Sequence, residues 1–165
     1  MTPEPGIRQT TDEKDIRYCA TMMLDTDPWK KLGYDIGRCM AAFEGPCREV
    51  WVLEIAGAIK GFAVLQVCGS FRGYIQTICI DNKLRGQGLG SMLLGFCESR
   101  ILEFSPNIFI CVSAFNKGAL KLYQASGFKI VGELENFVKE GYNEILLRKT
   151  AGPLIGFKPG KSIRI

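Results

Sequence analysis

The most informative stretch of the sequence is Arg85-Gly86-Gln87-Gly88-Leu89-Gly90-Ser91. A β-like run, residues 73–80, precedes it, and an apolar run with helical periodicity, residues 92–104, follows it. Glycines at such a junction leave backbone N–H groups uncovered by side chains, at the positive end of a helix dipole. We therefore expect the stretch to bind a phosphate group through its main chain. A glycine turn that binds no ligand is the alternative, because strand-to-helix turns use glycine for positive φ.

The spacing of the glycines argues against the common nucleotide-binding loops. A dinucleotide-binding loop needs G-x-G-x-x-G, and neither the frame that begins at Gly86 nor the frame that begins at Gly88 completes it. A P-loop needs a lysine and a serine or threonine after its last glycine, and this pair is absent. The pattern that remains is R-x-x-G-x-G, formed by Arg85, Gly88 and Gly90.

Length and composition favour one soluble domain. The chain has 165 residues, of which 47% are hydrophobic and 23% charged. We expect a single domain over residues 1–150, followed by a C-terminal tail, residues 151–165, that contains three glycines and two prolines. The net charge of +4 is too small to indicate a nucleic-acid partner. The sequence shows neither an apolar span long enough for a membrane nor a secretion signal at its start, so we expect a cytoplasmic protein.

Two residue types limit the chemistry. The seven cysteines form no C-x-x-C motif, and most lie in apolar runs, which predicts reduced thiols that pack as small hydrophobic groups. The sequence contains no histidine, which removes the commonest general base and the commonest transition-metal ligand. We therefore expect no metal site.

The pattern of apolar residues predicts a mixed sheet with helices on both sides. In chain order we expect a strand at 7–10, helices at 12–25 and 27–43, strands at 50–55, 62–67 and 73–80, a helix at 92–104, a strand at 107–113, a helix at 116–125, and two closing strands at 128–133 and 142–148 joined by an acidic loop.

Two motifs in this order resemble those of the GNAT acetyltransferase superfamily. The first is Ile78-Cys79-Ile80-Asp81 followed, after three residues, by the segment Arg85–Gly90. The second is residues 116–128, which are similar to the pattern N-x-x-A-x-x-L-Y-x-x-x-G-F. The resemblance covers about residues 5–149 and is nearest to ribosomal-protein alanine N-acetyltransferases. It implies an α/β fold with a mixed central sheet of about six to seven strands, helices on both faces, and strands splayed at a cofactor slot.

The resemblance implies acetyl-CoA as co-substrate and an amine as acceptor. The diphosphate would bind the N–H groups of the glycine stretch, and the pantetheine arm would pair with the strand before it. Asn116 would bond near the thioester and Tyr123 would lie close to the sulfur, whereas a helix N-cap and a core aromatic are the alternatives. The cofactor-binding residues expected are Ile78, Cys79, Ile80, Arg85, Gly86, Gln87, Gly88, Leu89, Gly90, Ser91, Asn116 and Tyr123.

The implied reaction is direct transfer, with Tyr123 as the catalytic proton donor to the departing thiolate. We interpret Cys79 and Cys111 as packing residues, because no histidine is present to activate a thiol. The base is not evident. Members of the family carry a carboxylate near the positions of Gln76 or Thr77, or at that of Cys111. This leaves Glu54 or a chain of water molecules here, and a solvated strand face is the alternative for Glu54.

The acceptor is defined least by the sequence. The resemblance places the early helices and the closing strands around it, with aromatic and acidic groups suited to a cationic amine. Solvated loop acids and a packed tryptophan are the alternative, and a peptide α-amine, a lysine side chain and a polyamine all stay open. A CoA-binding sensor or interaction module without turnover, and a nucleotide-binding domain, are competing functions; a homodimer is also left open. The residues concerned are Trp29, Tyr34, Glu44, Glu133, Glu135, Glu140 and Tyr142.

Overall fold

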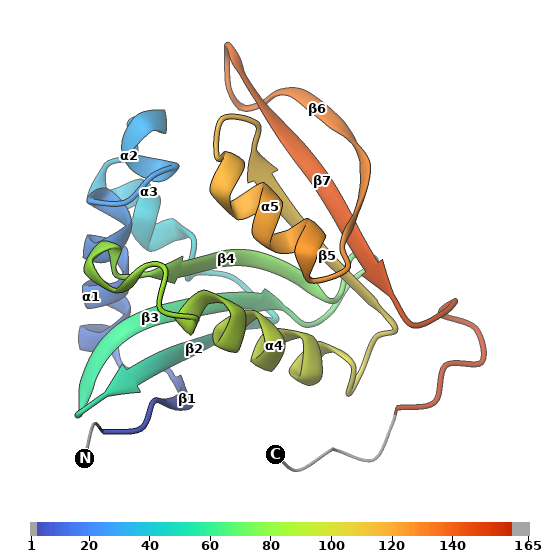
Figure 1. Ribbon diagram of the computed structural model, residues 1–165, viewed down its shortest axis with the longest axis horizontal. Helices are drawn as coiled ribbons and strands as arrows, with labels where there is room; N and C mark the ends of the chain where they lie inside the picture. The colour runs from blue at the N-terminus through green and yellow to red at the C-terminus, as the bar shows by residue number, and fades with distance from the viewer. Residues whose placement is uncertain (1–2, 160–165) are drawn as a thin grey trace.

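The computed structural model describes residues 3–159 and contains a mixed seven-stranded sheet with helices on both faces (Figure 1). The strand order is β1-β2-β3-β4-β5-β7-β6, in which only the β4–β5 pair is parallel. The fold class expected from the sequence is thus confirmed. The strands are β1 Gly6–Thr10, β2 Arg48–Ile55, β3 Ala58–Gln66, β4 Tyr74–Ile80, β5 Asn107–Ser113, β6 Lys129–Lys139 and β7 Tyr142–Thr150. The helices are α1 Glu13–Leu24, α2 Trp29–Leu32, α3 Ile36–Ala41, α4 Leu89–Ile101 and α5 Lys117–Ala125, with a 3-10 turn η1 at Asn82–Leu84.

Successive side chains of the central strands point to opposite faces of the sheet, and this divides the core into two layers. Phe62 and Val64 of β3 face α1 and α3, where Met23 is fully buried. Ala63 and Leu65 of the same strand face α4 and pack in a second cluster. The sheet is therefore covered on both faces, as Figure 1 shows, and its central strands are rigidly held.

The parallel pair β4–β5 separates soon after it begins. The two strands pair only at Tyr74 with Phe109 and at Ile75 with Ile110. Beyond these pairs the strands diverge (Figure 1). Gly73 holds the joined end, because its N–H donates to the carbonyl of Gln66 and its carbonyl accepts from the N–H of Phe109. This divergence confirms the splayed strands that the resemblance implied.

The prediction of one helix over residues 27–43 is wrong. The segment is divided into α2 and α3, because Gly33 ends α2 in the left-handed conformation, with φ of 78°. Asp35 then begins α3, and its carboxylate accepts a hydrogen bond from the N–H of Arg38. The break leaves Tyr34 in a connection between two short helices.

The closing strands are longer than expected. β6 continues to Lys139 through the segment that was expected to be an acidic loop, and a tight turn at Glu140 and Gly141 joins it to β7. Asn136, with φ of 53°, interrupts the register, and its side-chain oxygen accepts from the N–H of Gly141. Lys139 then reaches across to α2, where its Nζ lies 3.1 Å from the carbonyl oxygen of Leu32.

The prediction that the cysteines are reduced is wrong for two of them. Cys47 and Cys68 form a disulfide between the loop before β2 and the loop after β3, with their Cα atoms 5.5 Å apart. The two loops are brought together by the β2–β3 pairing, which the cysteine spacing in the sequence does not reveal. Cys19, Cys39, Cys79 and Cys97 are buried free thiols, as expected of small hydrophobic groups.

Two further features concern the ends of the chain and the membrane. Residues 151–159 of the expected tail contain no helix or strand, and residues 160–165 lie outside the described part. Within residues 3–159, no helix combines the length and the hydropathy that crossing a bilayer would require.

We expect Gly73→Ala to destabilise the fold strongly. A Cβ at Gly73 would lie 2.3 Å from the carbonyl oxygen of Asn107 and 2.9 Å from Cγ2 of Ile101, and φ is 92°. The joined end of β4 and β5 would have to open, at a cost of about 3 kcal/mol or more in the free energy of unfolding. Gly69→Ala is the matched control, because its φ is 85° but no atom lies within 4 Å of its Cβ position. Equal urea midpoints for the two variants would contradict this account.

Candidate active site

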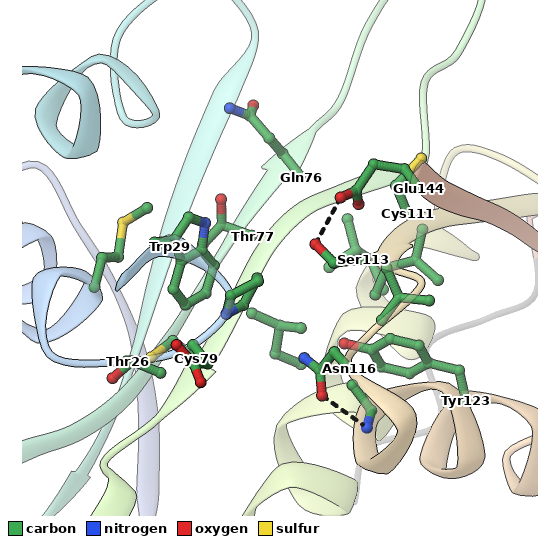
Figure 2. A pocket seen from close by; sticks show the side chains of 18 of the residues that line it. Thr26, Trp29, Gln76, Thr77, Cys79, Cys111, Ser113, Asn116, Tyr123 and Glu144 are labelled. Carbon is green, nitrogen blue, oxygen red and sulfur yellow. Dashed lines mark hydrogen bonds between the residues drawn. The ribbon is translucent and has the colours of Figure 1, made fainter. Parts of the chain in front are cut away.

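The divergence of β4 and β5 opens a cavity of about 540 Å³. Its walls come from segments far apart in the sequence: α2, β4, the glycine stretch, β5, α5 and the β6–β7 hairpin. Figure 2 shows Trp29, Thr77 and Cys79 on one side, facing Tyr123 and Glu144 on the other. Eight of the expected cofactor residues line this space, namely Ile78, Cys79, Ile80, Arg85, Gly86, Gly90, Asn116 and Tyr123.

The glycine stretch forms the open end of the cavity. Gly86 and Gly88 have φ of 76° and 82°, and no atom lies within 4 Å of a Cβ position at either residue. Gly88 precedes α4 without a side-chain cap. Within residues 3–159, the N–H groups of residues 86–91 form no hydrogen bond. Such a set of free N–H groups at a helix N-terminus fits a diphosphate.

Four expected residues of this stretch do not line the cavity: Gln87, Gly88, Leu89 and Ser91. The side chain of Leu89 is buried in the core beneath α4, so only its main chain faces outward. Any role of these residues toward a ligand rests on their N–H groups, and their assignment stays a prediction.

The second half of β4 has one free edge. Residues 78–80 pair with β3 on one side, with Phe62 opposite Cys79 and Gly61 opposite Ile80. On the other side the β4–β5 ladder has already ended. The main chain facing the cavity is thus free to pair with an extended, amide-containing ligand in the manner of an added strand.

Asn116 and Tyr123 enter the cavity from either end of α5. The Oδ1 of Asn116 accepts from the N–H of Ala119 at 3.3 Å, so Asn116 caps the helix while it lines the cavity. The Tyr123 ring is 6% exposed and packs against Phe128, and Figure 2 shows its hydroxyl directed toward Asn116 and the cavity. Burial raises the pKa of the Tyr123 hydroxyl, which therefore keeps its proton at neutral pH.

Glu54, the carboxylate suggested as a base, is not at the site. It lies on β2, does not line the cavity, and accepts from Nη2 of Arg8 at 2.6 Å. Gln76 does line the cavity, but its Nε2 donates to the carbonyl oxygen of Ala42 at 3.2 Å. Sequence position alone did not reveal that β2 turns Glu54 toward β1.

Of the residues expected around an acceptor, only some line the cavity. Trp29 and Tyr34 line it, as expected. The hairpin contributes Phe137 and Val138, which the sequence analysis did not single out. Glu44, Glu133, Glu135, Glu140 and Tyr142 do not line the cavity, and the ring of Tyr142 packs edge-on against Phe115.

Glu144 is the functional candidate that the sequence analysis missed. It lies on β7 opposite Ser113 of β5, lines the cavity, and is only 6% exposed. The hydroxyl of Ser113 donates to its carboxylate at 2.6 Å (Figure 2). Burial raises the pKa of Glu144, and the hydrogen bond from Ser113 opposes that rise. The signal in the sequence was an acidic residue just before an apolar run, Ile145-Leu146-Leu147.

The two thiols in the cavity wall are poor nucleophiles. Burial raises the pKa of Cys79 to about 12 and also raises the pKa of Cys111. Thiols with raised pKa values contain little thiolate at neutral pH. Among the described residues, no three side chains of the metal-binding types gather at one place.

Comparisons with solved structures show the same fold. The ribosomal-protein-S18-alanine N-acetyltransferase of Escherichia coli superposes with a TM-score of 0.75 at 17% identity, over 91% of this chain and 96% of that one. An N-acetyltransferase of Staphylococcus aureus gives a TM-score of 0.65 at 23% identity, over 89% and 98%. A Bacillus anthracis structure, named for streptothricin acetylation and solved with acetyl coenzyme A, gives 0.57 at 23% identity, over 65% and 64%.

Curated relatives are similar over parts of their length. An uncharacterized protein of Mycobacterium leprae is 26% identical in an alignment 160 positions long that covers 90% of this chain and 42% of the relative. The chloroplastic GCN5-related N-acetyltransferase 6 of Arabidopsis thaliana is 36% identical over 73 residues, which are 42% of this chain and 25% of the relative. The chain thus spans less than half of the length of these relatives.

The sequence model of the acetyltransferase (GNAT) family matches residues 14–128, more than half of the chain. The matched region runs from α1 through the glycine stretch to the end of α5 and so includes most of the cavity wall. Since this match covers more than half of the chain, the chain belongs to the acetyltransferase (GNAT) family.

Proposed function

We propose that this protein transfers the acetyl group of acetyl-CoA directly to a primary amine. The observation that carries the proposal is the continuity of the cavity. It extends from the free N–H groups of the glycine stretch, past the unpaired edge of β4 and Tyr123, to an end lined by Trp29 and Glu144. A diphosphate, an amide-containing arm, a thioester and an acceptor would fit in that order.

The cofactor assignment rests on main-chain groups. The N–H groups of residues 86–91 would receive the diphosphate, with Arg85 beside them as a counter-charge. The free edge of residues 78–80 would pair with the pantetheine amides. This arrangement would bring the thioester to the part of the cavity that Asn116 and Tyr123 line.

The chemistry follows from a thioester that is already activated. The amine nitrogen attacks the thioester carbonyl carbon, the N–C bond forms, and the C–S bond breaks. The sulfur leaves with the electron pair, and its thiol has an ordinary pKa of about 8.5. Tyr123 would donate a hydrogen bond and then a proton to it, and the raised pKa of its hydroxyl means that the proton is present at neutral pH.

The acceptor end supports an amine. The aromatic side chains of Trp29 and Tyr34 line it together with a buried carboxylate, and such a combination binds cations by cation–π contact and charge complementarity. The S. aureus and E. coli proteins of the same fold are also named N-acetyltransferases.

Matched acceptors test this function. CoA thiol release from acetyl-CoA is measured with 2-phenylethylamine, spermidine, a peptide with a free N-terminal alanine, and a peptide with a free lysine side chain. The control acceptor is 2-phenylethanol, which has the same ring but no amine. We expect at least one amine to stimulate release well above the alcohol. Tight acetyl-CoA binding without stimulation by any amine would favour a sensor and contradict the proposal.

Gly86→Ala should weaken acetyl-CoA binding. Gly86 lines the cavity at φ of 76°, and a methyl group there would meet the incoming diphosphate. Gly57→Ala is the matched control, because its φ is 74°, its Cβ position is also open, and it lies outside the cavity. We expect both variants to lose about 1 kcal/mol of stability. Only Gly86→Ala should raise the Kd for CoA, by about tenfold or about 1.4 kcal/mol, in calorimetric titrations. An equal Kd for both would remove the glycine stretch from the site.

Tyr123→Phe should lower kcat by about 10²-fold and leave the Kd for CoA nearly unchanged. Within residues 3–159, no side-chain hydrogen bond acts on the Tyr123 hydroxyl, so its removal should not reduce the melting temperature. Tyr18→Phe, at a side chain that is 50% exposed and outside the cavity, is the control. A Tyr123→Phe variant as fast as wild type would exclude the hydroxyl as the acid.

A further inference from the structure

We propose that Glu144 binds the ammonium group of the acceptor and takes its proton before acetyl transfer. This role rests on the proposed function and supplies the base that the sequence left undefined. It is carried by the position of Glu144 in the cavity and by the absence of a positively charged partner for its carboxylate among the described residues.

The position of Glu144 is fixed by the sheet. It is directly opposite Ser113 in the antiparallel β5–β7 ladder, and the hydroxyl of Ser113 donates to its carboxylate at 2.6 Å. Both residues line the cavity and both are buried. Figure 2 shows them on the same side of the cavity as Tyr123, which is across from Trp29. The backbone of Glu144 is fixed by the ladder and its carboxylate by the hydroxyl, so the carboxylate is preorganised.

The surroundings of Glu144 contain no described cation. The titratable groups that face it are Tyr34 from the α2–α3 connection, Tyr74 of β4 and Cys111 of β5. None of these side chains carries a positive charge. Other buried or half-buried glutamates are paired, as Glu49 is with Arg100 at 2.7 Å and Glu98 is with Lys149 at 2.6 Å. Buried carboxylates are ordinarily paired in this way. Glu144 instead has one hydroxyl donor and an open cavity.

The other carboxylate in the cavity wall has a different setting. Asp27 is exposed and accepts from the N–H of Lys31 at 3.2 Å. It also borders a shallow hollow at the outside of the glycine stretch, together with the basic side chains of Lys30 and Arg85. Asp27 thus lies near basic side chains at the proposed phosphate end, whereas no ion pair of Glu144 is found among the described residues.

With Glu144 as base, every proton of the reaction is accounted for. A protonated amine gives one proton to Glu144 and becomes nucleophilic. After the N–C bond forms and the C–S bond breaks, the nitrogen loses a second proton, which replaces the proton that Tyr123 gives to sulfur. The products are the N-acetyl amine and CoA thiol, and Glu144 returns its proton to solvent. No further reactant is required.

Glu144→Gln tests this role with Glu54→Gln as control, because Glu54 lies outside the cavity and pairs with Arg8. With the fastest amine of the panel, we expect kcat/KM at pH 7 to fall by about 10²-fold in Glu144→Gln and by less than about twofold in Glu54→Gln. The Kd for CoA should be unchanged in both. A Glu144→Gln variant that binds CoA and turns over within about twofold of wild type would overturn the inference.

The pH dependence separates chemistry from a structural role. For wild type, log kcat/KM should rise with pH as Glu144 ionises, above the ordinary glutamate value of 4.5 because its pKa is raised. Ser113→Ala removes the hydrogen bond that favours the charged form, so the rise should move to higher pH; in Glu144→Gln it should disappear. An unchanged acidic limb in both variants contradicts the role of Glu144 alone. A wild-type protein that acetylates no amine contradicts the proposed function itself.

In Glu144→Gln, the melting temperature at pH 8 should rise although the activity falls. Because the folded-state pKa of Glu144 is raised, ionising it costs stability; the cost is absent below the ordinary value of 4.5 and complete above the raised value. Glu144→Gln, which keeps a polar partner for Ser113, should therefore melt above wild type at pH 8, with the difference vanishing near pH 4. A lower melting temperature than wild type at pH 8 would show that the carboxylate is there for the fold.

Discussion

The early end of pairing between β4 and β5 is the constraint on which the rest of the site depends. Two pairs of residues join these strands, and beyond them the sheet opens while both of its faces stay covered by helices. A gap inside a packed sheet exposes main-chain groups that would otherwise be paired. The cavity, the free edge of residues 78–80 and the approach to Tyr123 all follow from this one irregularity. Gly73 limits the opening to one end, because its close contact with Asn107 leaves no room for a side chain.

Some polar groups around the gap have hydrogen-bond partners inside the fold and others do not. The groups that lack full partners are those with a role in the proposed chemistry. The Oδ1 of Asn116 has a partner inside the fold, and Gln76 is held by Ala42. The N–H groups of residues 86–91 and the carboxylate of Glu144 lack full partners among the described residues. Unsatisfied groups of this kind reduce stability unless a ligand completes them. The molecule thus keeps a donor surface at one end of the cavity and an acceptor of protons at the other.

The sequence defined the phosphate-binding half of the site better than the acceptor half, for a physical reason. The glycine stretch, Asn116 and Tyr123 belong to contiguous motifs, so they could be identified as candidates from local patterns. Glu144 meets Ser113 only through a ladder between strands 31 residues apart, which no local pattern encodes. The sequence left the setting of Glu54 open for the same reason, since its contact with Arg8 is set by the β1–β2 pairing. The break at Gly33 and the Cys47–Cys68 bond likewise depend on tertiary context.

The donor surface of the glycine stretch is built from peptide groups, and peptide groups are identical in every protein. Apart from the glycines that leave room for a ligand, such a surface depends little on side-chain identity, so the neighbouring sequence can change while the proposed diphosphate site is kept. The acceptor end is made of side chains such as Trp29, Phe137 and Glu144, and each replacement there alters what fits. Two proteins that share 17% and 23% of their residues with this chain superpose on it, so the fold itself tolerates wide changes of sequence. Under the proposed function, substitutions in the side-chain wall of the cavity would therefore change the acceptor, whereas substitutions beside the glycines would leave the carrier site in place.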